Sequence, residues 1–576
     1  MKNILCKLLL ILFVFSLPIS LKAEKFHGKI QTNRKKAQTK DAGERCRRAQ
    51  GATELNINNV RARIGTGGNM WYDGASAQYF VPKDGNSTSL YCAALWIGGE
   101  DELGQLRLAA MRFGQSGDDF WPGPITNDNT AYTDAAVCNE FDRHFKINKA
   151  DVERFVGMCT GNNGAFNFAE YSAEDVPEII DQWKQIANLK KPGYSKYLAP
   201  FYDNDGDGEY NWENGDYPYY DLSNELCPRT IKASLKPGDK YEDIPTMESE
   251  AKWMGRDTIK GGKLVDQVLK GDQTLWWVFN DKGNTHTETG GTPIGLEIRA
   301  QAFAFSTNDE INNMTFYSYE IVNRSSYTLS QTYFSQWVDP DLGYAGDDYV
   351  GCDVERGLGY CYNGKAVDGP GTGAYQGIPP AVGIDFFQGP YMDPDSLDNP
   401  KIDIDKMRAS IDANKLTTPV QQGGYAIYDS VTGVFLQLDT IRLTDDAALF
   451  KDYWYFKPGD IVGNCAINGV NFGNGIIDDE RFGMRRFVYY NNNLNPVNGE
   501  PMEAKDYYNY LRGIWKNNQR MTYGGSGITA SGGGPGEVPY CDFMFPGNSD
   551  RWNWGTDRSE ERRVGKECRS RWSPYH

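Results

Sequence analysis

Short apolar runs separated by Gly, Asn, Asp and Pro dominate the chain from residue 54 onward. Runs of this kind, rich in β-branched and aromatic residues, predict strands, and their spacing favours sandwiches or other antiparallel sheets. We therefore expect a mainly β fold of antiparallel, sandwich-like domains, with a few packed helices and long loops rich in Gly and Asx residues. The strand-predicting runs are 55–64, 89–99, 105–113, 274–280, 295–305, 314–323, 332–338 and 434–443.

Two segments instead carry the repeat of a helix that packs on a sheet. In residues 175–187, Asp175 predicts the N-cap, a proline follows in the first turn, and apolar side chains then form one stripe. Residues 502–516 align aromatic and apolar side chains in the same way. Each segment therefore predicts one amphipathic helix.

A chain of 576 residues is long enough for at least two domains. The polar stretch 234–245 is the predicted join. It separates an N-terminal β-rich domain over 49–240, with a helical insertion and an acidic loop, from a second and incomplete β-rich domain over 246–557. Residues 24–48 are basic and lack a periodic pattern, which predicts a flexible leader.

The two ends differ from the rest of the chain. Residues 1–23 combine a basic head, a short apolar run and a small residue, Ala23, which is typical of a secretory signal peptide. The apolar run is shorter than the ~20 residues of a spanning helix, so we expect a secreted or cell-surface protein without a membrane span. Residues 558–576 are basic and resemble, along their whole length, the in-frame translation of a sequencing adapter.

The charge balance excludes some partners. Asp and Glu number 77 against 60 Lys and Arg, a net charge of −17. Nucleic acid and anionic membrane surfaces are therefore poor partners. The eleven cysteines allow disulfides in an exported chain, but spacing alone leaves their pairing open.

Residues 202–218, YDNDGDGEYNWENGDYP, predict a calcium loop. Alternating acidic side chains around a glycine can supply the oxygen ligands and the sharp bend that calcium needs. The stretch resembles the loose loops of dockerin and thrombospondin-type repeats, because Asn214 occupies the position where an EF-hand has its closing glutamate; a solvated acidic turn is the alternative. The predicted ligands are Asp203, Asp205, Asp207, Glu209 through its carbonyl, Asn211 and Asp216.

A second acidic stretch, residues 338–353, predicts another calcium site, because like charges this dense are costly without a cation among them. In both places we expect calcium to stabilise the chain and not to do chemistry. The predicted ligands in this stretch are Asp339, Asp341, Asp347 and Asp348.

Material for catalysis is scarce in the sequence. Four histidines are too few and too scattered to favour a zinc triad or a Ser-His-Asp site. A two-carboxylate glycosidase needs no histidine and stays open. Glu297 and Glu320 are candidate carboxylates, although pairing with a neighbour such as Arg299 at a sheet surface is the favoured interpretation.

Aromatic residues make up 13% of the chain, and several Trp stand beside Pro, Gly or Asp. Flat rings beside polar side chains suit the faces of sugars, although β-sandwich cores use the same residues. We therefore expect a calcium-stabilised surface protein that binds glycans or other surfaces, as an adhesin or binding module, rather than an enzyme. The alternative is a secreted hydrolase with two carboxylates that acts on polysaccharide.

Six motifs together resemble a group of large secreted proteins of the Bacteroidota: ALWIGG, DDFWPGP, the DNDGDG loop, VDPDLGYAGDDYVGCD, PPAVGIDFFQGP and FMFPGNSD. The resemblance covers most of residues 50–557. Members of this group usually end in a type IX secretion sorting domain. The resemblance thus implies the cell surface as location and the type IX machinery as partner, through a C-terminal domain that is missing from this sequence.

Overall fold

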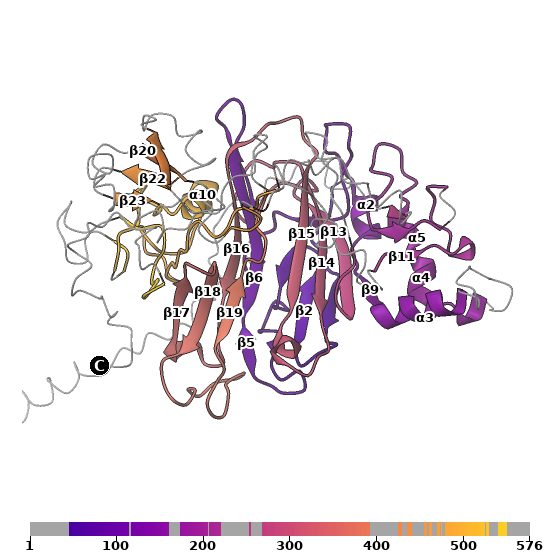
Figure 1. Cartoon of the computed structure of the whole chain (residues 1–576), viewed down its shortest axis with the longest axis horizontal. Helices are drawn as coiled ribbons and strands as arrows, with labels where there is room; N and C mark the ends of the chain where they lie inside the picture. The colour runs from indigo at the N-terminus through magenta and orange to yellow at the C-terminus, as the bar shows by residue number, and fades with distance from the viewer. Residues whose placement is uncertain are drawn as a thin grey trace, which may run out of the picture.

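The computed structural model confirms a mainly β chain with antiparallel sheets and few helices. Figure 1 shows the strands as two neighbouring layers, with most of the helices at one side. The structure describes residues 45–114, 117–159, 173–204, 207–220, 253–254, 268–391, 424–428, 435–439, 454–457, 460–462, 469–472, 474, 479–524, 526–528 and 540–549.

The first sheet runs in the order β16-β6-β3-β2-β4-β5, with β1 beside β2 and β7 beside β6. Its central strand β6 is buried along almost its whole length. All of its strand pairs are antiparallel. Its strands are β1 (Ala52–Leu55), β2 (Arg61–Gly65), β3 (Asn69–Met70), β4 (Tyr79–Phe80), β5 (Thr88–Leu90), β6 (Cys92–Glu100), β7 (Leu106–Ala110) and β16 (Ser330–Asp339).

The second sheet runs in the order β15-β14-β13-β8, with β9 also paired to β13. Side chains of both sheets share one hydrophobic core, which makes the two layers a sandwich. Its strands are β8 (Trp121–Pro122), β9 (Phe145–Asn148), β13 (Gln273–Asn280), β14 (Leu296–Ala304) and β15 (Phe316–Asn323).

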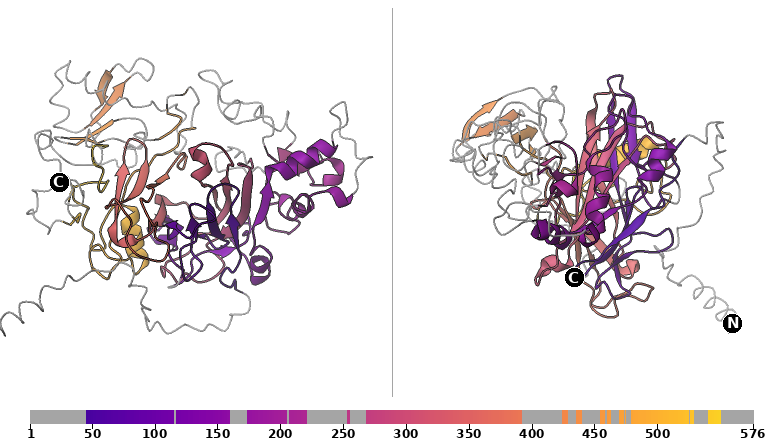
Figure 2. Two further views of the ribbon diagram at one scale, coloured as in Figure 1. Left: turned by 90° about the horizontal axis from the view of Figure 1, so that it is seen from below. Right: turned by 90° about the vertical axis from the view of Figure 1, so that its right-hand side faces the viewer.

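Strand β13 is buried on both faces, which explains its uninterrupted apolar sequence. Because successive side chains of a strand point to opposite faces, Trp277 joins the core of the sandwich while Trp276 joins a second core with the helices. Figure 2 shows these helices on the side of the second sheet. They are α2 (Ala135–Glu140), α3 (Lys149–Cys159), α4 (Glu178–Gln182) and α5 (Lys184–Ala187).

On the other side of the sandwich, α10 (Ala504–Leu511) packs against β6, β7 and β16. Gly98 of β6 permits this approach, since a Cβ there would lie 3.2 Å from the Tyr508 ring and 2.6 Å from the Leu108 side chain. A small antiparallel sheet lies nearby (Figure 1), formed by β17 (Asp348–Asp353), β18 (Leu358–Asn363) and β19 (Val382–Asp385).

Further short strands and turns complete the described chain. Two small antiparallel sheets have the orders β11-β10-β12 and β21-β20-β22-β23. These strands are β10 (Phe201–Tyr202), β11 (Tyr217–Pro218), β12 (Trp253–Met254), β20 (Gly424–Tyr428), β21 (Phe435–Asp439), β22 (Trp454–Lys457) and β23 (Asp460–Val462). The 3-10 turns are η3 (Ala173–Asp175), η4 (Trp212–Asn214), η6 (Glu310–Asn313) and η7 (Ala345–Asp347).

The first predicted helix forms with different bounds. Asp175 is not its N-cap but ends the turn η3, and the α-helical part starts after Pro177 and breaks at Trp183. Proline disfavours helical backbone in the residue before it, which explains the later start. The predicted apolar stripe is correct, because Ile180, Trp183 and Ile186 are fully buried.

The second predicted helix is shorter than expected, since α10 ends at Leu511. Gly513 lies just beyond it with a positive φ of 68°, a conformation that stops a helix and that glycine adopts without strain. Trp515 nevertheless stays fully buried, and its ring donates a hydrogen bond to the carbonyl of Gly527 (2.7 Å).

The predicted division into domains at 234–245 is wrong for the two large sheets. Strand β16, which follows the predicted join, pairs with β6, which precedes it, and β13 pairs with β8 and β9 in the same way. Pairing between distant segments leaves no mark in local composition, so a polar stretch was a poor boundary signal. Residues 234–245 themselves lie outside the described residues.

The end of the predicted leader 24–48 belongs to the fold. Cys46 is buried, forms a disulfide with Cys138 of α2, and donates its backbone N–H to the carbonyl of Gly283 (3.1 Å). The rest of the leader, the signal peptide and residues 558–576 lie outside the described residues. Among the helices that are described, none has the length and apolar character needed to span a bilayer.

We expect Trp276→Ala and Trp277→Ala each to lower the free energy of unfolding by about 3–5 kcal/mol, because both neighbouring rings are buried, one on each face of β13. Urea unfolding of the purified protein measures this. Leu103→Ala is the control, since Leu103 is 83% exposed and should change stability by no more than about 0.5 kcal/mol. A neutral result at either Trp would contradict the burial of β13 between two layers.

Candidate functional site

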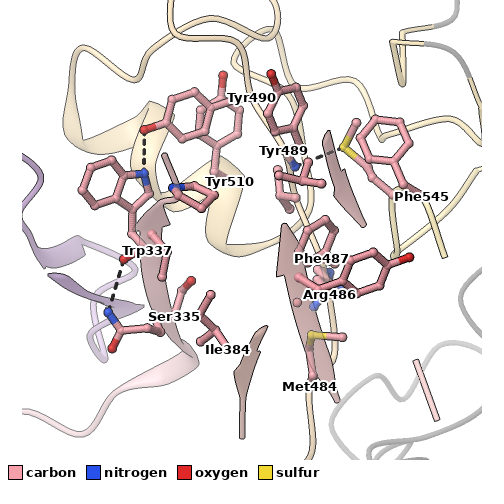
Figure 3. A pocket seen from close by; sticks show the side chains of 18 of the residues that line it. Ser335, Trp337, Ile384, Met484, Arg486, Phe487, Tyr489, Tyr490, Tyr510 and Phe545 are labelled. Carbon is pink, nitrogen blue, oxygen red and sulfur yellow. Dashed lines mark hydrogen bonds between the residues drawn. The ribbon is translucent and has the colours of Figure 1, made fainter. Parts of the chain in front are cut away.

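A pocket of about 830 Å³ lies between the first sheet, the small sheet β17-β18-β19, α10 and the chain around residues 482–500. We call it the aromatic pocket. Figure 3 shows Trp337, Tyr490 and Tyr510 together on one side of it and Phe487, Tyr489 and Phe545 on the other. Its polar lining includes Ser335, Asp339, Asp341, Asp348, Arg485, Arg486, Asn491, Asn498 and Glu500.

The pairing of β6 with β16 builds the floor of the pocket. In this register Trp96 lies opposite Ser335, Ala94 opposite Trp337, and Cys92 opposite Asp339. Opposite residues point to the same face of a sheet, and side chains two positions apart do so as well. The sequence SQWVD therefore places Ser335, Trp337 and Asp339 on the face that is covered by α10 and the pocket.

The aromatic rings on this face hold one another in place. The Trp337 ring stacks on Trp96 with centroids 6.1 Å apart and donates its indole N–H to the Tyr490 hydroxyl at 2.7 Å (Figure 3). Tyr490 in turn stacks on Tyr510 with centroids 5.1 Å apart. Because stacked and hydrogen-bonded rings lose little freedom when a ligand binds, this wall is preorganised.

Two carboxylates of the pocket lining, Asp339 and Glu500, interact through their charges. Glu500 forms an ion pair with Arg112 (3.3 Å), and Arg112 also binds the buried Glu288 (2.8 Å). Asp339 forms no side-chain hydrogen bond or ion pair in the part of the chain that the structure describes. Burial and the nearby carboxylate of Glu500 raise the pKa of Asp339 to about 7.

The carboxylates of the second acidic stretch have different neighbours. Asp347 approaches Lys365 (3.4 Å), and Asp348 accepts the backbone N–H of Leu342 (2.8 Å). Asp339, Asp341 and Asp348 line the aromatic pocket. Within the described residues, no three His, Cys, Asp or Glu side chains are grouped so that they could hold a metal ion. Calcium at residues 338–353 stays a prediction.

The first acidic stretch is a loop closed by the antiparallel pair β10 and β11. The Tyr202 and Tyr217 rings stack across this pair, 4.9 Å apart. Asp216 is fully buried, and its two oxygens accept the backbone N–H groups of Asn204 (2.8 Å) and Asn211 (2.7 Å). The carboxylate predicted to replace the closing glutamate thus ties both ends of the loop together.

Inside the loop, Asp203 accepts the backbone N–H of Gly208 at 2.9 Å, and Gly208 makes the sharp bend with a φ of 74°. This bend at the sixth position is the one that a calcium loop requires. The Asp207 carboxylate accepts the N–H of Glu209 (2.7 Å). The buried carboxylates of Asp203 and Asp216 therefore fit a cation, whereas Asp205 lies outside the described residues.

Two other predicted ligands have additional partners. The Glu209 carboxylate binds Lys196 (2.9 Å) and Lys190 (3.2 Å), so only its backbone carbonyl fits the predicted role. The side chain of Asn211 accepts the N–H of Glu213 (3.0 Å) and caps η4. Calcium at this loop stays a prediction.

The other candidate carboxylates have structural partners. Glu297 is fully buried and forms ion pairs with Arg299 and Arg324, each at 3.0 Å. Glu320 of β15 lies opposite Arg299 of β14, and their charged groups are 3.6 Å apart. The predicted pairing with Arg299 forms for both glutamates, but Glu297 is fully buried and does not lie at the sheet surface where it was expected. Burial lowers the pKa of His144 to about 3, so this ring is neutral where it contacts Thr53.

Sequence reasoning missed several residues of the pocket. Glu500 and Asn498 lie in irregular segments without a periodic or motif signal. Only Asp339, Asp341 and Asp348, predicted as calcium ligands, pointed to this place. Comparisons of the chain with protein-family models, curated proteins and solved structures gave no match.

We expect saturating calcium to raise the melting temperature by a few degrees and chelation to reverse the rise. The reason is that a ligand that binds only the folded state adds about 2.7 kcal/mol to the free energy of unfolding when its concentration is 100 times its Kd. Differential scanning calorimetry measures the shift. Asp203→Asn should abolish it, whereas Glu213→Gln, at an exposed carboxylate of the same loop, should keep it. An unchanged melting temperature at saturating calcium would exclude the metal site.

We expect the free energy of unfolding to fall as the pH rises from about 4 to about 7, because folded Asp339 keeps its proton up to about pH 7 while the unfolded chain releases it near the ordinary value of 3.8. The folded state binds more protons in this window, so the slope from Asp339 is negative and at most about 1.4 kcal/mol per pH unit.

Urea unfolding across this pH range, with chelator present, measures the slope. Asp339→Asn should flatten it, and Glu310→Gln, at an exposed carboxylate, should leave it unchanged. A slope that is identical in wild type and Asp339→Asn would show that Asp339 titrates normally.

Proposed function

We propose that the protein is exported, stabilised by calcium, and binds glycans in the aromatic pocket at the cell surface or in the medium. The observation that carries the proposal is the pocket itself, in which preorganised Trp and Tyr rings stand beside carboxylate and amide side chains. Export through the type IX machinery is part of the proposal and rests on the motif resemblance.

The size and lining of the pocket suit a sugar chain. Binding pockets of about 300–1,000 Å³ hold small ligands, with apolar walls and a few polar groups that orient the ligand. Sugars present apolar faces to rings and hydroxyl groups to polar side chains. Tyr489 is 42% exposed and lies beside Phe545, so its ring is accessible to a ligand.

A second candidate is hydrolysis of a polysaccharide. Asp339 and Glu500 are two pocket carboxylates in different environments, since only Glu500 is paired with an arginine. A protonated and an ionised carboxyl group are what a glycosidase needs as acid and base. Release of reducing ends from the glycan that binds would distinguish this candidate from simple binding.

A glycan array probed with the purified protein, with and without calcium, tests the proposal. We expect binding to one class of glycans and a loss of about tenfold in affinity for Tyr489→Ala, because one stacking ring contributes on the order of 1 kcal/mol. Tyr132→Ala is the matched control, since Tyr132 is 54% exposed and does not line the pocket. Equal binding by both variants would place the glycan elsewhere, and no binding by wild type would overturn the proposal.

A further inference from the structure

We propose that the glycan held in the aromatic pocket is an amino sugar with a free, cationic amine, and that this amine lies between Asp339, Glu500 and Asn498. The inference rests on the proposed function, because it names the class of glycan that the same pocket binds. Charge, hydrogen-bonding capacity and the aromatic wall each support it.

The pocket has more negative charge than its own cations offset. Arg112 is shared by Glu288 (2.8 Å) and Glu500 (3.3 Å), so one guanidinium serves two carboxylates. The negative charge of Glu500 raises the pKa of Asp339, and Asp339 has no cationic partner in the described chain. Arg486, also in the lining, is directed to Asp542 (3.8 Å). Carboxylates this close favour a cation beside them.

The lining of the pocket includes a buried acceptor that a ligand could bind. Asn498 is only 4% exposed, lines the pocket, and its side-chain oxygen has no hydrogen-bond partner within the described residues. A buried amide oxygen without a partner is costly, which points to a donor supplied by the ligand. An ammonium group offers three donors and no acceptor, whereas a sugar hydroxyl offers only one donor.

The aromatic wall favours an ammonium group over a metal ion. Trp337 and Asp339 share a strand face, and Tyr490 and Tyr510 continue the wall beside Trp337. Cations are attracted to the faces of such rings. A calcium ion would need a set of oxygen ligands, and within the described residues no three acidic, His or Cys side chains form one.

Three trimers of equal length test the inference: β-1,4-linked glucosamine, its N-acetylated form, and cellotriose, which has a hydroxyl group in place of the amine. Isothermal titration calorimetry is done near neutral pH, with chelator and about 0.15 M salt, which screens non-specific attraction to an acidic protein. We expect the glucosamine trimer to bind at least about tenfold more tightly than the other two, because its amine forms charge-assisted hydrogen bonds.

Pocket variants separate specific from general attraction. Asp339→Asn should weaken binding of the glucosamine trimer about tenfold or more and leave the affinity for the N-acetylated trimer unchanged. Glu500→Gln should act in the same direction, although it also removes a partner of Arg112. Glu310→Gln removes one exposed carboxylate far from the lining and should change neither affinity.

The outcomes distinguish this inference from the proposed function. If neutral trimers bind as tightly as the glucosamine trimer, or if Asp339→Asn and Glu310→Gln have equal effects, the amine inference is overturned while glycan binding stands. If no glycan on the array and none of the trimers binds wild type, the proposed function fails and the inference fails with it.

Discussion

The antiparallel pairing of β6 with β16 is the contact on which the rest of the structure depends. It joins an early and a late segment of the chain and so completes the first layer of the sandwich. Because strand side chains alternate, the same pairing places Leu95 and Ile97 on one face and Trp96, Trp337 and Asp339 on the other. One set of backbone hydrogen bonds thus supports both the core and the wall of the aromatic pocket.

Carboxylates that are not fully paired with cations are the main electrostatic feature of the pocket. Burial normally expels unpaired charge, yet Asp339 lies beside Glu500, and Arg112 is already shared with Glu288. In the free protein, protonation of Asp339 relieves this conflict; in a complex, a cationic ligand would relieve it. The buried carboxylate of Glu297, in contrast, is paired with Arg299 and Arg324.

The two acidic stretches have similar composition, but their carboxylates bind different partners. In the 202–218 loop, backbone N–H groups bind the Asp203 and Asp216 carboxylates and fold the chain around them. In the 338–353 stretch, the strand ends at Asp339, and the later carboxylates of Asp347 and Asp348 bind Lys365 and the N–H of Leu342. Charge density alone could not distinguish these cases, because ligand geometry depends on the path of the backbone.

The sequence by itself determined most of the long strands and the buried stripe of residues 175–187, because each depends on periodicity over a few residues. Only the tertiary structure decided which strands share a sheet, and therefore that no domain boundary separates β6 from β16. It also decided that Glu500 and Asn498 lie in one pocket with Asp339. Contacts between distant segments are fixed by packing and strand pairing, which leave no local pattern to read.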